Sequence, residues 1–213
     1  MKRMGPHRSP RAGRMFSANV LFRTIQAIAA AVDAKSLFSR EHSSRVTQLC
    51  LDIGSEMGLS KDDLDVLEFA ATVHDIGKIG TPESLLSKMG RLTDEDWSSI
   101  RDHPRVGATF LASIDELREV ASIIRHHHER MDGYGYPDNL RGEAIPLLSR
   151  ILAVADAFEA MTADRPYRRA MSPSNALEEL RANAGEQFDP DVVKAAAAVI
   201  QRNYLQKSEQ RAA

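Results

Sequence analysis

Histidine residues that could bind a metal are gathered in a few short stretches of this chain. Six of the seven histidines lie in four places, at His42, His74, His103 and the triplet 126–128. The only cysteine is Cys50, so a metal site here must be built from imidazole and carboxylate groups. A single histidine on a helix is more often a surface or core residue than a ligand. The four clusters together therefore indicate a metal site that none of them would indicate alone.

The stretch HDIGKIG, residues 74–80, has the most specific spacing. His74 and Asp75 are adjacent, and adjacent side chains on a helix lie only ~100° apart around its axis. Both groups can therefore face one ion, the imidazole as a terminal ligand and the carboxylate as a bridge. Gly77 allows the backbone to turn at once, which leaves Lys78 free to point at whatever the metal binds.

The stretch HHHERMDGYGYP, residues 126–137, offers three more imidazoles. On a helix His126 and His128 would be ~200° apart and could not share one centre, whereas either neighbouring pair could. Spacing alone leaves the pairs 126/127 and 127/128 equivalent. The competing interpretation is a solvated helix end, where the helix dipole favours cationic histidine. The other histidine clusters count against it.

Asp156 is the remaining carboxylate of interest. It lies in the apolar stretch LAVADAFEAM, where burial of an unpaired charge would be costly. Asp156 therefore needs a cation nearby. A salt bridge to Arg165 is the ordinary explanation, and a metal is the favoured one because the histidines have few other reasons to cluster.

The pattern of apolar residues is helical nearly everywhere. Val20, Ile25, Ile28 and Val32 predict a first helix that ends near Ala34. Capping residues and prolines indicate the other helix starts, which are Ser60, Thr93, Pro104, Pro146, Ser172 with Pro173, and Asp189 with Pro190. Helices are also expected over 41–57 and 117–128. Because no persistent alternation of period two occurs, we predict an all-α fold, a compact helical bundle.

Composition limits the class of protein. The chain has 213 residues, of which 43% are hydrophobic and 27% are charged, and its net charge is −2. This balance lacks the excess of basic residues that is typical of proteins that bind a nucleic-acid polymer. No apolar run approaches the ~18 residues of a membrane span. The single cysteine fits a reducing compartment, so a cytoplasmic location is expected.

One domain with short extensions is expected. Residues 1–15 are basic and contain proline and glycine, which predicts a disordered arm. The domain is predicted over 16–205, and its first helix, 16–34, could serve as a linker or as the contact of a homodimer. A polar tail follows at 206–213.

Five separate stretches, in this order, resemble the HD-GYP domain, a branch of the HD phosphohydrolase superfamily. They are HSSRV at 42–46, HDIGKIG at 74–80, HPRVG at 103–107, HHERMDGYGYP at 127–137 and RILAVADAFEAMTADRPYR at 150–168. The resemblance covers residues 20–205. The pattern HD followed by lysine is common by chance, whereas HHExxDGxGYP is highly specific. The resemblance implies a helical bundle of the HD-domain type.

The resemblance also distinguishes the histidines of the triplet and implies a ligand set. In the family, two histidine ligands stand immediately before the glutamate, which selects His127 and His128 and leaves His126 as a bystander. The implied ligands are His42, His74 and Asp156 for one ion, His103, His127 and His128 for the other, and Asp75 as the bridge. These donors suit two divalent ions, iron or manganese, with zinc or nickel as competitors.

The implied activity is hydrolysis of cyclic di-GMP, a bacterial second messenger. Attack by a metal-bridging hydroxide would give linear pGpG, with GMP as a further product. Asp75 would hold the ions together, and Lys78 would stabilise charge on the phosphate or the leaving oxygen. Arg165 and Arg168 are expected to contact phosphates and guanines, with Tyr136 as a wall beside the substrate.

The chain departs from the family pattern before the first histidine. Members commonly carry aspartate, tyrosine and threonine where this chain has Ser36, Phe38 and Ser39. Trinuclear members have a glutamate ligand at the position of Phe38. A phenyl ring cannot bind a metal, so two ions are predicted. Met131 and Tyr134 are also unusual within the GYP loop, and these changes bear on substrate fit and turnover.

Two other functions remain open from the sequence. The first is an HD-type phosphohydrolase of another nucleotide, which the GYP loop argues against. The second is a non-catalytic module that binds metal or cyclic di-GMP and reports to a signalling partner. Missing ligands would favour that module, and none of the expected ligands is missing from the sequence.

Overall fold

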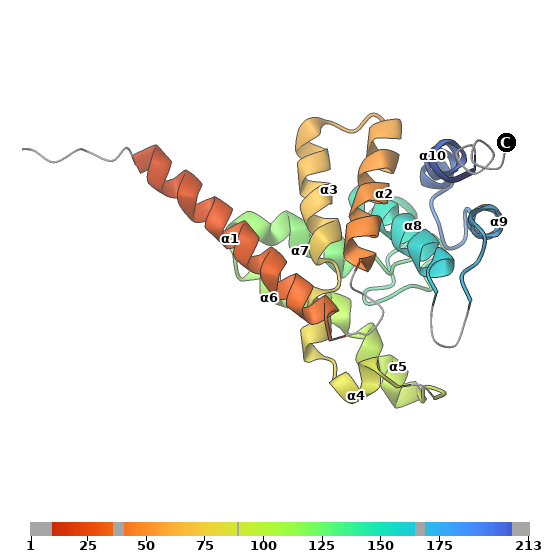
Figure 1. Cartoon of the computed structure of the whole chain (residues 1–213), viewed down its shortest axis with the longest axis horizontal. Helices are drawn as coiled ribbons and strands as arrows, with labels where there is room; N and C mark the ends of the chain where they lie inside the picture. The colour runs from red at the N-terminus through yellow and green to blue at the C-terminus, as the bar shows by residue number, and fades with distance from the viewer. Residues whose placement is uncertain (1–9, 36–40, 89, 165–168, 206–213) are drawn as a thin grey trace, which may run out of the picture.

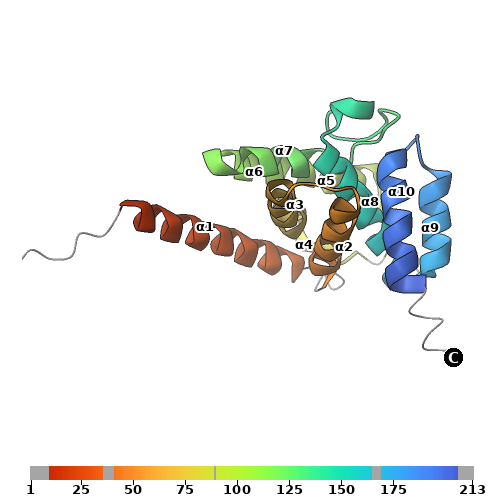
Figure 2. The ribbon, with the colours of Figure 1, turned by 90° about the horizontal axis from the view of Figure 1, so that it is seen from above.

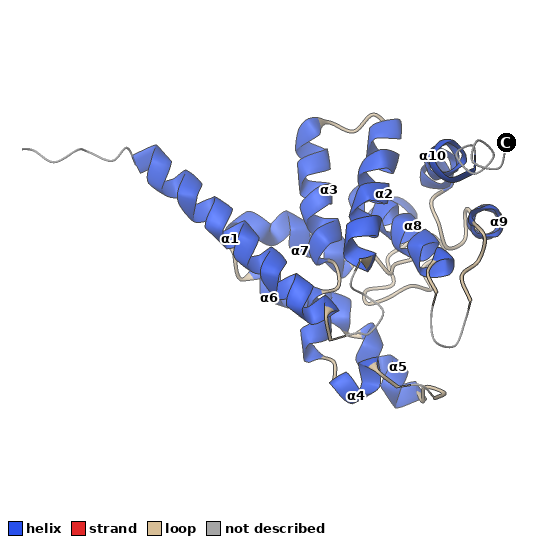
Figure 3. Cartoon of the chain, viewed as in Figure 1, coloured by secondary structure: helices blue, strands red, loops and turns tan. Residues whose placement is uncertain are grey.

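The computed structural model describes residues 10–35, 41–88, 90–164 and 169–205. Within these ranges every regular element is a helix or a helical turn, which confirms the all-α prediction (Figure 3). Some residues singled out from the sequence lie outside these ranges, namely Ser36, Phe38, Ser39, Arg165 and Arg168, together with residues 1–9 of the arm and the tail 206–213.

A central pair of antiparallel helices organises the bundle. Helices α2 (His42–Glu56) and α3 (Lys61–Val73) pack along each other, and α8 (Leu147–Thr162) packs against α2 (Figure 1). Helices α9 (Pro173–Ala182) and α10 (Pro190–Ile200) cover the far end of this group, and a π-helical turn, Gln201–Leu205, follows α10 (Figure 2). Together these helices bury a continuous apolar core.

The other side of α3 is covered by a second helix pair. Helix α7 (Arg118–Arg125) packs on α3 and on α6 (His103–Ala112). Helix α6 in turn packs against the 3-10 turn η1 (Ile76–Gly80) that follows α3. The short helices α4 (Glu83–Leu86) and α5 (Asp94–Arg101) connect η1 to α6. None of the described helices is long and apolar enough to cross a membrane.

The capping signals in the sequence set the helix starts. Ser60 accepts a hydrogen bond from the backbone N–H of Asp63, and Ser172 caps α9 in the same way. Thr93 and Asp96 cap each other reciprocally at the start of α5. Each such cap stabilises its helix by ~1 kcal/mol. The predicted helix starts at these residues are confirmed.

Helix α1 (Pro10–Asp33) begins earlier than predicted and packs on the outside of the bundle. Residues 10–15, which were predicted to belong to a disordered arm, are helical. Ile25, Ala29 and Val32 are buried where α1 meets α3 and η1. Its amino-terminal part extends away from the other helices (Figures 1 and 2).

The histidine triplet lies beyond a helix and not on one. Helix α7 ends at Arg125, with His126 as its C-cap, and a turn continues through His128. The helical angles used to compare pairs within the triplet therefore do not apply. The chain leaves the helix here, and the rings of His127 and His128 lie close together, with 4.0 Å between their centroids.

A glycine allows η1 to touch the start of α6. A Cβ atom on Gly77 would lie 1.9 Å from the carbonyl oxygen of His103 and 2.5 Å from the backbone nitrogen of Gly107. Both neighbours are backbone atoms and cannot move aside. The contact places the segment that carries Asp75 directly against the segment that carries His103.

We expect Gly77→Ala to lower the free energy of unfolding by about 2–3 kcal/mol, because overpacking against backbone forces η1 and α6 apart. Gly80→Ala is the matched control in the same turn, since its Cβ would meet only a Val106 methyl group at 3.5 Å. Urea denaturation measures both variants. Equal stability of the two would contradict the close approach.

Candidate metal centre

Three imidazoles are fixed so that one nitrogen points inward. The Nδ1 atoms of His74, His103 and His127 lie 2.8, 2.7 and 2.6 Å from the carbonyl oxygens of Ala71, Ile100 and Ile124. A carbonyl oxygen only accepts, so each Nδ1 carries the hydrogen and each Nε2 is left with a free lone pair. In each case the carbonyl belongs to the residue three positions earlier, at the turn where the histidine stands.

The Nε2 atoms of these rings and of His42 converge on one centre. The Nε2 atoms of His42 and His74 are 3.3 Å apart, and those of His103 and His127 are 3.5 Å apart. Donor atoms within 4.8 Å of one another form three overlapping groups. These groups are His103 with His127 and His128, His42 with His74 and Asp75, and His74 with His127 and Asp156. The structure thus brings together all seven residues of the predicted ligand set.

Asp75 lies between the histidine groups. Its Oδ1 is 3.3 Å from Nε2 of His103, and its Oδ2 is 3.5 Å from Nε2 of His74 and 3.8 Å from Nε2 of His42. One carboxylate therefore presents one oxygen to each side. Although Asp75 is buried, Lys78 and the surrounding histidines hold its pKa well below the usual range. The group is an anion with the geometry required of a bridging ligand.

The electrostatics of the His103 group fit a cation. Burial lowers the pKa of His103 to about 4 and that of His128 to about 3, and it holds the pKa of His127 well below its usual value. All three rings are therefore neutral near pH 7. His103 and His127 then direct two lone pairs at each other across 3.5 Å, an arrangement that a divalent ion between them would relieve.

Asp156 faces the other end of the centre. Its Oδ1 lies 3.2 Å from Nε2 of His42. Burial alone would lower the pKa of His42, but Asp156 and Glu159 raise it to about 10. The alternative partner considered from the sequence, Arg165, lies outside the described residues.

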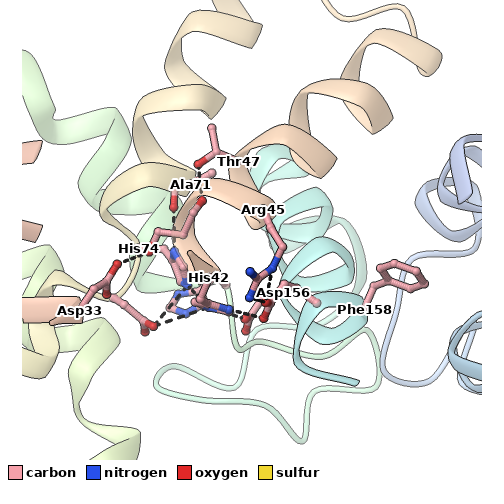
Figure 4. A network of polar contacts seen from close by, with 12 residues as sticks. Asp33, His42, Arg45, Thr47, Ala71, His74, Asp156 and Phe158 are labelled. Atoms are coloured by element: carbon pink, nitrogen blue, oxygen red, sulfur yellow. Dashed lines mark hydrogen bonds and ion pairs between the residues drawn. The ribbon is translucent and has the colours of Figure 1, made fainter. Parts of the chain in front are cut away.

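Sequence reasoning missed Glu159, which holds His42 from behind. The buried Glu159 carboxylate contacts Nδ1 of His42 through Oε2, and its Oε1 accepts a 2.9 Å hydrogen bond from Nε of Arg45. Figure 4 shows His42 and Arg45, which Glu159 contacts, beside Asp156. A carboxylate that orients a histidine fixes the ring and makes it a better donor. The available signal was a second acidic residue, three positions after Asp156, in the same apolar helix.

His126 turns away from the centre. Its Nε2 lies 3.0 Å from Oδ2 of Asp138, a carboxylate that also receives two hydrogen bonds from Arg125. His126 belongs to none of the donor groups in the described part of the chain. The placement agrees with the bystander role implied by the resemblance.

The GYP loop folds back over the segment that carries the histidines. Its buried Glu129 accepts hydrogen bonds from the backbone N–H groups of Asp138 and Leu140, and a Cβ on Gly135 would lie 2.4 Å from the Cα of Glu129. The ring of Tyr136 lies 4.9 Å from that of His128. Tyr136 therefore borders the centre, and its role as a wall beside the substrate stays a prediction. Tyr134 is 85% exposed and points away.

The chain matches a known protein family. The model of the HD domain family matches residues 26–192. The chain belongs to the HD domain family. This membership and the relatives below confirm the HD-GYP resemblance of its motifs.

Several curated relatives carry named activities. The chain is 40% identical to the cyclic di-GMP phosphodiesterase response regulator RpfG of Xanthomonas campestris, over 81% of this chain and 46% of the relative. It is 41% identical to 3′3′-cGAMP-specific phosphodiesterase 1 of Vibrio cholerae, over 70% and 35%. It is 36% identical to a cyclic di-GMP phosphodiesterase of Thermotoga maritima, over 82% and 48%. The chain thus spans about half the length of these relatives, or less.

Solved structures share the fold. One is V-cGAP3, a cyclic GMP-AMP-specific phosphodiesterase of V. cholerae, with a TM-score of 0.64 and 22% identity over 84% of this chain and 49% of that one. Another is the PgpH phosphodiesterase HD domain of L. monocytogenes, with a TM-score of 0.58 and 13% identity over 83% and 94%. The helical bundle of the HD-domain type is therefore confirmed.

We predict unequal effects of substitutions in the triplet. His126→Ala should keep the full metal content, because the ring faces Asp138, whereas His127→Ala should lose about one equivalent because it removes an inward donor. Metal analysis by mass spectrometry after dialysis measures both. Equal losses in the two variants would contradict the asymmetry.

We predict that Glu159→Gln weakens metal affinity by about 10–100-fold, the usual effect of removing the carboxylate behind a histidine ligand. Competition with a chelator measures the affinity. Glu41→Gln is the matched control, because Glu41 contacts the same Arg45 but is exposed. An unchanged affinity in a folded Glu159→Gln variant would show that His42 does not depend on Glu159.

Proposed function

We propose that this chain is a metal-dependent phosphodiesterase that hydrolyses cyclic di-GMP. The observation that carries the proposal is the position of Asp75, with one oxygen directed at His103 and the other at His42 and His74. The relatives named as cyclic di-GMP phosphodiesterases support the choice of substrate. The chemistry and the substrate are thus inferred from separate observations.

The metal centre proposed is binuclear. His42, His74 and Asp156 would hold one divalent ion, His103, His127 and His128 the other, and Asp75 both. Nitrogen and oxygen donors without thiolate suit iron or manganese, and zinc or nickel would compete. When bound, two such ions would supply an activated water and neutralise charge on the phosphodiester. The count of two rests on Phe38, which lies outside the described residues.

Lys78 is the proposed electrostatic catalyst. Its Nζ lies 2.5 Å from Oδ2 of Asp75, and although burial alone would lower its pKa, that carboxylate raises it. Lys78 therefore stays cationic at neutral pH. Its side chain is 26% exposed, so it can donate to a phosphoryl or leaving oxygen at the edge of the centre.

The remaining substrate contacts follow the family pattern. Tyr136 would form a wall beside the bound nucleotide, supported by its contact with His128. Arg165 and Arg168 would bind phosphate or guanine through their planar guanidinium groups. The product would be linear pGpG, and GMP after a second hydrolysis.

Another cyclic dinucleotide is the leading alternative substrate, because relatives of similar identity are specific for 3′3′-cGAMP. A non-catalytic module that binds metal or cyclic di-GMP is disfavoured by the complete donor set around Asp75. Contacts with signalling partners, and a homodimer formed through α1, remain predictions.

We predict that Asp75→Asn abolishes hydrolysis of cyclic di-GMP and lowers metal content. Lys78→Met should keep the metal and lower kcat by about 10²–10³-fold, as loss of one preorganised donor does. The assay is chromatography of cyclic di-GMP, 3′3′-cGAMP and pGpG with anaerobically purified, metal-loaded protein.

Lys61→Met is the matched lysine control, since Lys61 pairs with an aspartate on the exposed face of α3. No turnover of any cyclic dinucleotide by the loaded protein would reject the enzyme. Faster turnover of 3′3′-cGAMP than of cyclic di-GMP would move the substrate to the alternative.

A further inference from the structure

A cation and two aromatic rings meet beside the metal centre. The guanidinium carbon of Arg101 lies 5.7 Å from the ring centroid of Trp97 and 5.6 Å from that of Tyr136. No carboxylate within the described residues forms an ion pair with Arg101, whereas its neighbour Arg105 is paired with Asp102 at 2.6 Å. Arg101 therefore retains hydrogen-bond donors for a ligand.

The Trp97 side of this group opens into a hollow of about 450 Å³. The hollow is lined by Asp94, Trp97, Ser98, Arg101 and Asp102. Trp97 is 46% exposed, an unusual state for so large an apolar ring. The lining thus combines an exposed stacking surface, one cation and two carboxylates.

Ring contacts connect the hollow to the metal centre. Arg101 lies over Tyr136, and the ring of Tyr136 contacts that of His128. The His128 ring in turn packs edge to face with that of His103, with 5.1 Å between the centroids. The hollow and the centre are therefore adjacent subsites. A ligand whose phosphate reached the centre could place another group over Trp97.

The chemistry of the lining selects a guanine base. Carboxylates repel phosphate but accept hydrogen bonds from N–H groups, which guanine offers at N1 and N2. Arginine pairs with the O6 and N7 acceptors of guanine, and an exposed ring stacks on the face of a base. Adenine lacks both O6 and the N2 amino group.

We propose that Trp97, Arg101 and Asp94 form a guanine-binding subsite next to the metal centre. The inference rests on the proposed hydrolysis of cyclic di-GMP and adds residues outside the five motif stretches. The base stacks on Trp97, Arg101 binds its acceptor edge, and Asp94 accepts from its donor edge. The subsite holds the substrate and takes no part in bond cleavage.

Kinetics test the subsite. Trp97→Leu and Arg101→Gln should each raise KM for cyclic di-GMP about tenfold, the scale of losing one base stack, with kcat unchanged because the contact is equal in ground and transition states. Trp97→Phe keeps a ring and should recover most of the affinity. Arg118→Gln, an exposed arginine paired with Asp115, is the control.

Fluorescence gives a readout that does not need turnover. Trp97 is the only tryptophan in the chain, so its emission reports on this hollow alone. In the slow variant Lys78→Met, titration with cyclic di-GMP should change the emission, with a midpoint matching calorimetry. Cyclic di-AMP should bind at least about tenfold more weakly, as expected for the wrong base.

The possible results distinguish failure of the proposed guanine subsite from failure of the proposed function. Normal hydrolysis with unchanged KM in Trp97→Leu and Arg101→Gln would overturn the subsite and leave the proposed function standing. Calorimetric binding of cyclic di-GMP without any change in emission would overturn it as well, and so would the absence of binding. Base-selective binding with a change in emission, but no hydrolysis by the wild type, would support the subsite and reject the enzyme.

Discussion

The site depends on one buried carboxylate that must contact histidines from three separate segments. His42 begins α2, His74 ends α3 and His103 begins α6. Oδ1 of Asp75 lies 3.3 Å from Nε2 of His103, and its Oδ2 lies 3.5 and 3.8 Å from Nε2 of His74 and His42. An ion inserted among these groups would replace many weak, partly repulsive contacts by strong ones. Metal binding and folding are therefore expected to stabilise each other.

Close backbone packing makes this convergence possible. Gly77 lets η1 approach His103 more closely than any side chain would permit. The carbonyl groups of helix ends then fix Nδ1 of His74, His103 and His127, while Glu159 does the same for His42. Helix termini with free carbonyls thus serve both to end a helix and to orient a ligand. Orientation of these donors is a property of the fold and not of any ion.

The sequence predicted the elements well where local chemistry decides them. The caps at Ser60 and Thr93 depend on residues three positions apart and were visible directly. The geometry of the histidine triplet was not visible in the sequence, because the end of α7 depends on how the GYP loop packs back on Glu129. Glu159 and Arg101 were missed for a similar reason, since Glu159 contacts His42 and Arg101 contacts Tyr136 across long stretches of sequence. Sequence motifs therefore identify the metal-binding side chains, whereas only tertiary contacts identify the residues that orient them.

The positions of bound metal ions test the bridging role of Asp75 most directly. Crystals of the manganese-loaded protein, measured at an anomalous wavelength, should contain two peaks about 3.5–4 Å apart on either side of the Asp75 carboxylate. One peak should contact His42 and the other His103. A single peak, or two peaks that do not share Asp75, would contradict the bridging carboxylate on which the account depends.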